Sequence, residues 1–195
     1  MTCRTVAILL FNEVEVLDFA GPFEVFAVAG ELHEPAPFRV YTVAAGPGPI
    51  CARNGLSVNP DYRLSDAPRA DVLIVPGGIG TRALLGDTDL LDGIAAAARQ
   101  AELVLSVCSG ALLLARAGLL AGLRATTHHE VLDVLRELAP ATEIVAGARY
   151  VDNGRVITAA GISAGIDASL HVVGRLCGEE VSARTATYME YRSLP

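Results

Sequence analysis

Cys108 stands in a segment suited to a nucleophile, Ser106-Val107-Cys108-Ser109-Gly110, between an apolar run and a helix rich in Ala and Leu. A sharp strand-to-helix turn strains its central residue and needs small residues two positions away on each side. Ser106 and Gly110 meet that need. The helix that follows would direct free N–H groups and the positive end of its dipole at the sulfur. We therefore predict a reactive thiol at residue 108, with a buried core cysteine at a tight turn as the alternative.

The helix end alone activates such a thiol only weakly. An unperturbed thiol has a pKa of about 8.5, which leaves a few per cent thiolate at neutral pH. A helix terminus contributes roughly 0.3–2 kcal/mol, which lowers the pKa by about one unit at most. A hydrogen-bond donor close to the sulfur, such as a protonated carboxylic acid, would add to this effect. An ionised carboxylate would oppose it.

An acidic residue and a glycine pair, like Cys108, each follow a predicted strand. Asp18 comes after the apolar run at 5–11, and Gly77-Gly78 comes after a second run at 72–75. In open α/β sheets, ligands bind beyond the carboxyl ends of the strands, where these residues and Cys108 would meet. The backbone N–H groups of Gly78 and Ser109 could then hold a developing negative charge. Taken alone, Gly77-Gly78 reads as a strand-ending turn and Asp18 as a helix cap.

The elements that must position these residues alternate between strand and helix. We predict helices at 23–29, with Pro22 in the first turn, and over most of 84–101, with a break near Gly86-Asp87. The other predicted strands are 38–44 and 103–107; the other helices are 109–117, 166–176 and 179–190. Asn153-Gly154 predicts a hairpin between 149–151 and 155–158. This order predicts one α/β domain over residues 1–195, a three-layer doubly wound and mostly parallel sheet.

Composition narrows the possible functions. The chain of 195 residues is 52% hydrophobic and 19% charged, without the ~18 consecutive apolar residues of a membrane span. No secretion leader is recognised at the start, so a cytoplasmic location is expected. The net charge is −7 and the basic residues are scattered, which argues against nucleic-acid binding.

No cofactor is predicted. The four cysteines are far apart in the sequence, so no Cys-x-x-Cys metal or redox pattern exists. The Gly77-Gly78-Ile79-Gly80 stretch lacks the lysine and the spacing of a phosphate loop, and no dinucleotide fingerprint is found. We therefore expect no metal ion, and a small-molecule substrate as the ligand.

Over nearly its whole length, the chain resembles the ThiJ/PfpI superfamily of flavodoxin-like, class I glutamine amidotransferase-like folds. Two branches are most similar: isocyanide hydratases, and the amidase-like domain that precedes the DNA-binding part of certain AraC-type regulators. The motifs that carry the resemblance are Leu17-Asp18-Phe19-Ala20-Gly21-Pro22-Phe23-Glu24-Val25-Phe26, Val75-Pro76-Gly77-Gly78, Val107-Cys108-Ser109-Gly110, Ala117-Gly118-Leu119-Leu120, Arg124-Ala125-Thr126-Thr127-His128 and Gly161-Ile162-Ser163-Ala164-Gly165-Ile166-Asp167.

The resemblance implies Cys108 as nucleophile and Asp18 as its acidic partner, in a homodimer that buries part of the site at the subunit interface. Two positions depart from the common pattern: Ser109 replaces a threonine, and His129 replaces a tryptophan, which puts the pocket wall and substrate preference in question. The remaining implied site residues bind the oxyanion or substrate: Gly77, Gly78, Ser109, Gly161 and Ile162.

His128 and Glu24 are candidates for peripheral roles. His128 could form a Cys-His pair, but the hydratase pattern does not use a histidine there, so we assign it a structural or peripheral role. Glu24 is expected to pack or bond locally, although a glutamate near this segment meets the cysteine in other branches. His33, His129 and His171 are expected to be non-functional.

The leading hypothesis is an isocyanide hydratase-like lyase, in which Cys108 attacks the isocyanide carbon and hydrolysis yields an N-substituted formamide. A glyoxalase- or deglycase-like enzyme acting on reactive carbonyls is one alternative, and an intracellular peptidase is a weaker one. The non-enzymatic alternative is a redox or ligand sensor related to the regulator domain. Against the regulator, the sequence ends at Pro195 without a helix-turn-helix region.

Overall fold

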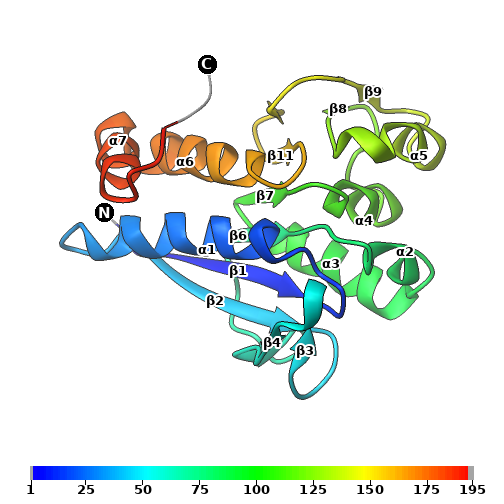
Figure 1. Cartoon of the computed structure of the whole chain (residues 1–195), viewed down its shortest axis with the longest axis horizontal. Helices are drawn as coiled ribbons and strands as arrows, with labels where there is room; N and C mark the ends of the chain where they lie inside the picture. The colour runs from blue at the N-terminus through cyan, green and yellow to red at the C-terminus, as the bar shows by residue number, and fades with distance from the viewer. Residues whose placement is uncertain (1, 193–195) are drawn as a thin grey trace.

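The computed structural model describes residues 2–192, which form a seven-stranded sheet between two layers of helices (Figure 1). The strand order is β10-β11-β7-β6-β1-β2-β5. All pairs in this sheet are parallel except β10 with β11. The bounds are β1 Arg4–Leu10, β2 Phe38–Ala44, β5 Tyr62–Arg63, β6 Val72–Val75, β7 Leu103–Ser106, β10 Tyr150–Asp152 and β11 Val156–Ala159. The doubly wound, mostly parallel α/β sheet is as predicted.

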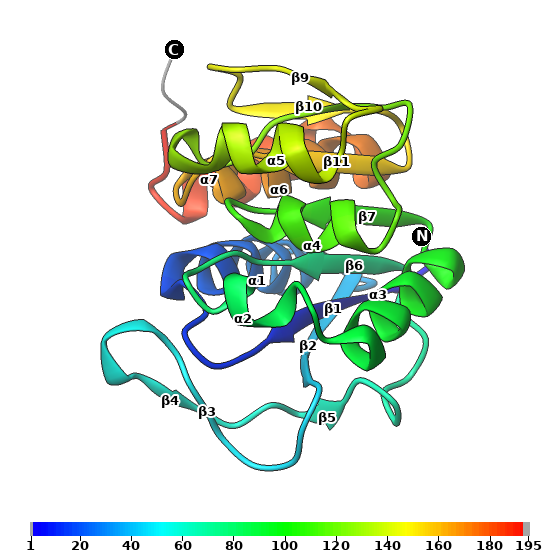
Figure 2. The same cartoon turned by 90° about the vertical axis from the view of Figure 1, so that its right-hand side faces the viewer.

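Helices cover both faces of the sheet. Figure 2 shows α2, α3, α4 and α5 in front of the sheet, with α1, α6 and α7 behind it. The bounds are α1 Val16–Glu31, α2 Thr81–Leu84, α3 Thr88–Gln100, α4 Gly110–Arg116, α5 Leu132–Leu138, α6 Ala164–Cys177 and α7 Glu179–Tyr188. Within residues 2–192, none of these helices combines the length and the apolarity that a membrane crossing requires.

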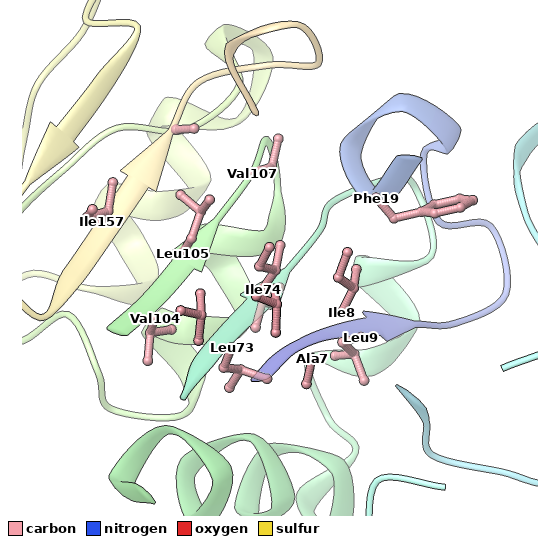
Figure 3. Packing of buried hydrophobic residues seen from close by; sticks show 14 of the residues in the cluster. Ala7, Ile8, Leu9, Phe19, Leu73, Ile74, Val104, Leu105, Val107 and Ile157 are labelled. Carbon is pink, nitrogen blue, oxygen red and sulfur yellow. The ribbon is translucent and has the colours of Figure 1, made fainter. Parts of the chain in front are cut away.

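The core lies on both faces of the central strands, as their continuous apolar sequence requires. In Figure 3, Ile8, Ile74 and Leu105 point to the side of α1, and Ala7 and Leu73 point to the opposite side. All five side chains are at most 3% exposed. A sheet buried on both faces is rigid, so the turns at its edge have fixed positions.

The first helix differs from the prediction. α1 begins at Val16, so Pro22 lies inside the helix and not in its first turn. A proline there removes one helical hydrogen bond. The buried face of α1, which includes Val25 and Phe26, outweighs this local preference. As a consequence, Asp18 lies in the first turn of α1, and the N-cap is Glu15.

The other predicted elements are found, with boundaries shifted by a few residues. The break near Gly86-Asp87 separates α2 from α3, and the Asn153-Gly154 turn joins β10 to β11. The sequence pattern missed α5 and several short strands. Those outside the main sheet are β3 Ile50–Cys51 with β4 Ser57–Val58, and β8 Arg124–Ala125 with β9 Glu143–Ile144.

Candidate active site

The topology brings three strand ends together. The chain passes from β1 to β2 on one side, and later to β6, β7 and β11 on the other, so β1 and β6 flank the switch point of the sheet. Val75 of β6 is in register with Ser106 of β7. Ser106 is also in the row of Thr158 on β11. The segments after these strands, which contain Gly77, Cys108 and Gly161, must therefore lie side by side.

Cys108 occupies a strained turn, as predicted. Its φ is 56°, in the left-handed region that non-glycine residues rarely adopt. Neighbouring segments hold this conformation: the Cys108 N–H lies 3.1 Å from the carbonyl oxygen of Ala160, and the Thr127 hydroxyl donates to the Cys108 carbonyl at 2.7 Å. The thiol is nearly buried, with the residue 7% exposed.

Gly110 and Gly77 allow the backbone segments to approach this closely. A side-chain carbon on Gly110 would overlap the Val75 carbonyl oxygen. A side-chain carbon on Gly77 would lie 2.5 Å from the Ser109 nitrogen and 2.9 Å from Oδ2 of Asp18. The prediction of a small residue two positions after Cys108 therefore has a direct steric cause. Gly77 is the contact point between the acid and the elbow.

Asp18 is fully buried beside Cys108. Its Oδ2 accepts the Gly77 N–H at 3.0 Å, while Oδ1 has no hydrogen-bond partner in the described chain. Burial raises the pKa of the carboxyl to about 7. The Gly77 N–H and the neighbouring Cys108 thiol lower that pKa, and the charge of Glu15 raises it. Near neutral pH, this carboxyl can therefore both give and accept a proton.

Burial, and not the helix end, dominates the pKa of the Cys108 thiol. Burial raises the pKa of Cys108 to about 12, and the negative charge of Asp18 adds to the rise. The backbone N–H groups of Ser109 and Ile162 act in the opposite direction. The desolvation of the sulfur outweighs the contribution of roughly one pKa unit that α4 supplies. At rest, the site therefore holds a neutral thiol next to an acid that titrates near neutrality.

The two glycines after β6 have different partners from those expected. The Gly77 N–H is bonded to Asp18, and the Gly78 N–H donates to Oγ of Ser109 at 3.0 Å. The Ser109 hydroxyl also contacts the Gly78 carbonyl at 3.1 Å and Oγ1 of Thr81 at 3.2 Å. The predicted oxyanion pair of Gly78 and Ser109 thus stays a prediction, with the Gly78 N–H already engaged. The N–H groups directed at the sulfur are those of Ser109 and Ile162.

A pocket of about 480 Å³ lies beside the elbow. Gly161, Ile162 and His128 line it, as does His129, which the sequence interpretation set aside. Cys108 and Asp18 are not among the lining residues, so Ile162 lies between the pocket and the sulfur that its N–H contacts. The lining is formed by residues 126–129, 147–149 and 160–163, with Leu132.

The structure places His128 in the pocket lining and Glu24 outside it. The His128 ring packs against Gly161, where an added side-chain carbon would overlap it, so this residue lies at the edge of the site. Glu24 is exposed on α1 and is absent from the pocket lining in the described chain. Arg149, also in the lining, was missed, because an arginine far from the recognised motifs gives no signal in the sequence.

Within residues 2–192, no group of three or more His, Cys, Asp or Glu side chains is arranged to hold a metal ion. The four cysteines are free thiols.

A nucleophile elbow and a buried acid at the switch point of a flavodoxin-like sheet define this site, and comparison with known proteins gives the family. The DJ-1/PfpI family profile matches residues 4–175, and the chain belongs to this family. An isonitrile hydratase from Pseudomonas putida is 37% identical over 190 residues, which is 97% of this chain and 79% of the relative.

Regulators are also among the relatives. The HTH-type transcriptional regulator CdhR of Pseudomonas aeruginosa is 31% identical over 183 residues. The chain spans about half the length of that protein, since the match covers 91% of this chain and 52% of CdhR. Among solved structures, a ThiJ/PfpI family protein from Pseudomonas syringae superposes with a TM-score of 0.89 at 32% identity, covering 100% of this chain and 78% of the other.

Proposed function

We propose that this chain is an isocyanide hydratase. The observation that carries the proposal is the contact between a buried acid, Asp18, and the elbow thiol, Cys108. An isocyanide carbon must accept both a nucleophile and a proton. The similarity to the Pseudomonas putida isonitrile hydratase supports the same conclusion.

The first step consumes a neutral thiol, which suits a sulfur with a raised pKa. The Cys108 sulfur forms a bond to the terminal carbon of R–N≡C as its S–H bond breaks. Asp18 receives this proton on one oxygen and delivers a proton to the same carbon, giving the thioimidate R–N=CH–S–Cys. The N–H groups of Ser109 and Ile162 stabilise the negative charge that develops on the sulfur during transfer.

The second step adds water. Asp18 takes a proton from the water as the water oxygen attacks the thioimidate carbon, and it passes this proton to the imine nitrogen, giving R–NH–CH(OH)–S–Cys. The tetrahedral intermediate then collapses: the C–S bond breaks as the C=O bond forms, the hydroxyl proton passes through Asp18 to the sulfur, and R–NH–CHO is released. The net reaction is R–N≡C plus H₂O to an N-substituted formamide, with the enzyme unchanged.

The test is direct. Purified protein is incubated with a neutral alkyl isocyanide, and the formamide is quantified by NMR while the isocyanide stretch is followed by infrared spectroscopy. We expect formamide formation that Cys108→Ala abolishes. Turnover no faster than with the Cys108→Ala protein would refute the proposal.

A ligand-sensing role is the second candidate, because CdhR and similar regulators match nearly the whole chain. A sensor would bind the small molecule without converting it, and calorimetry alongside the formamide assay separates the two roles. An oxidation sensor is less favoured, since such cysteines have a low pKa and are accessible. Consumption of methylglyoxal would instead indicate the glyoxalase-like alternative, which exposed Glu24 does not favour.

We also propose a homodimer located in the cytoplasm. Leu17 and Phe23 are large apolar side chains that are 38% and 37% exposed on α1, the helix that carries Asp18. Ala20 and Ala27 continue this row at helical spacing. Light scattering coupled to size exclusion would test the proposal, and a monomeric mass at micromolar concentration would contradict it.

A further inference from the structure

The pocket beside Cys108 has an unusual charge distribution. Three of its lining residues carry basic side chains, namely Arg149, His128 and His129. Thr126, Thr127 and Ser163 add hydroxyl groups, and none of the lining residues in the described chain is Asp or Glu. A neutral apolar substrate requires no such lining. A pocket of this composition is suited to a ligand that accepts hydrogen bonds and carries negative charge.

Asp167, which lies outside the pocket lining, holds the Arg149 side chain in place. Nε of Arg149 donates to Oδ2 of Asp167 at 2.7 Å, and Nη2 of Arg149 also bonds that oxygen. Asp167 is 9% exposed, is oriented through Oδ1 by the Tyr191 hydroxyl at 2.9 Å, and does not line the pocket. The guanidinium therefore faces the pocket while its counter-ion lies behind it. The Arg149 side chain keeps 37% of its surface exposed.

One donor of this guanidinium remains for a ligand. Of its five N–H donors, Nε and Nη2 bind Asp167, and Nη1 and Nη2 each contact Oγ of Ser163 at 3.3 Å, which leaves one N–H on Nη1. A ligand carboxylate can accept that N–H in a charge-assisted hydrogen bond. Asp167 fixes the guanidinium, so little side-chain entropy is lost when a ligand binds.

His128 adds a second donor. Its Nδ1 accepts the backbone N–H of Glu130 at 3.3 Å, which leaves the proton on Nε2. Burial lowers the pKa of His128, and His129 lowers it further, so the ring is a neutral donor at neutral pH. The ring lies against Gly161, next to Ile162, whose N–H contacts the reacting sulfur.

The anion-binding groups and the sulfur are close together along the chain. Ile162 contacts the sulfur and Ser163 contacts Arg149, and adjacent Cα atoms are about 3.8 Å apart. The pocket that contains Arg149 therefore begins at Ile162, the residue whose N–H contacts the sulfur of Cys108.

We propose that this pocket selects substrates that carry a carboxylate, with Arg149 as the residue that recognises it and Asp167 as its positioning residue. This inference rests on the proposed function, since it assigns the substrate class of the same site: isocyanides with an acidic group at the far end. It predicts that carboxylate-bearing isocyanides are preferred over their esters through tighter binding, and not through a faster chemical step.

Binding is measured first, in the Cys108→Ala background, where no turnover complicates the signal. The probes are two matched pairs of different length: isocyanoacetate with its methyl ester, and 4-isocyanobenzoate with its methyl ester. Isothermal calorimetry should show that the carboxylate of at least one pair binds about 10- to 100-fold more tightly than its ester, the range expected for one charge-assisted hydrogen-bonded pair. Equal affinity within both pairs, or no binding of either carboxylate, would overturn the inference.

Variants assign the effect to Arg149. Adding Arg149→Gln should abolish the carboxylate preference while leaving the affinity for the ester within a few-fold, and Arg149→Lys should restore part of it. The matched control is Arg99→Gln, which removes one positive charge from the exposed surface of α3. A circular dichroism melt confirms that each variant is folded. A preference that survives in folded Arg149→Gln and Arg149→Lys would refute the assignment.

Kinetics separate this inference from the proposed function. If the wild-type protein hydrates the esters but shows no KM advantage for the carboxylates, the substrate class is wrong and the hydratase proposal stands. If no isocyanide is hydrated but the carboxylates bind through Arg149, the hydratase proposal fails and the carboxylate site stands.

Discussion

Asp18 and Asp167 occupy equivalent positions and have different surroundings. Each is an acidic residue in the first turn of a helix, α1 and α6, and each is nearly or fully buried. Asp18 receives one backbone N–H and faces a thiol, whereas Asp167 is paired with Arg149 and Tyr191. A buried carboxyl without a counter-charge favours its protonated form, while a carboxyl paired with a guanidinium holds that partner in place. The first is suited to proton transfer and the second to orientation.

The largest expected effect concerns proton transfer by Asp18. Asp18→Asn keeps an oxygen for the Gly77 N–H but cannot exchange a proton, so kcat for isocyanide hydration should fall by about 10²- to 10⁴-fold. Steady-state formamide assays measure this change. Glu31→Gln is the control, an exposed carboxylate on the same helix. Activity within a few-fold of wild type would remove Asp18 from the mechanism.

The next effect is on the pH dependence of stability. Because folding raises the pKa of Asp18 from 3.8 to about 7, the folded state retains a proton that the unfolded chain releases. This contribution to the free energy of unfolding is fully present below pH 4. It declines as the pH rises and is lost above about pH 7, a total of roughly 4 kcal/mol at most.

Urea denaturation of wild type and Asp18→Asn across pH 4 to 8 tests this prediction. As the pH rises to about 7, the free energy of unfolding of the wild type should fall relative to that of Asp18→Asn. Above that pH, the difference between the two free energies should become constant. A difference that is independent of pH would mean that the Asp18 pKa is not raised.

Asp167→Asn should instead destabilise the fold. Arg149 would lose its charged partner, and hydrogen bonds to charged groups contribute about 1.5–3 kcal/mol. The free energy of unfolding at pH 7, from urea denaturation, should fall by roughly this amount. An unchanged stability would show that the Asp167–Arg149 pair does not contribute to folding, and would weaken the contrast with Asp18.

Tyr191→Phe should have the smallest effect. It removes one hydrogen bond to Asp167, at 2.9 Å, and leaves the ring in place. A loss of about 0.5–1.5 kcal/mol in the free energy of unfolding is expected. A loss as large as that of Asp167→Asn would mean that Tyr191, and not Arg149, is the main partner of this carboxylate.

Much of the fold was predictable from local patterns. Apolar runs such as 72–75 and 103–107 are buried on both faces, and such runs are typical of parallel strands. The short strands β3, β4, β8 and β9 were missed because two residues carry no periodicity. The start of α1 was misplaced because Pro22 favours a first turn, and only the packing of the helix outweighs that preference.

The sequence by itself predicted Cys108 as the nucleophile and Asp18 as its acid, and it located the strained turn at residue 108, because small residues two positions away on each side are typical of such a turn. The tertiary structure alone decided the protonation and the pocket. Burial raises the pKa values of Asp18 and Cys108 together. The pairing that directs Arg149 joins residues 149, 167 and 191. Desolvation and long-range charge pairing depend on what folding places around a residue, and neighbours in the sequence do not reveal this.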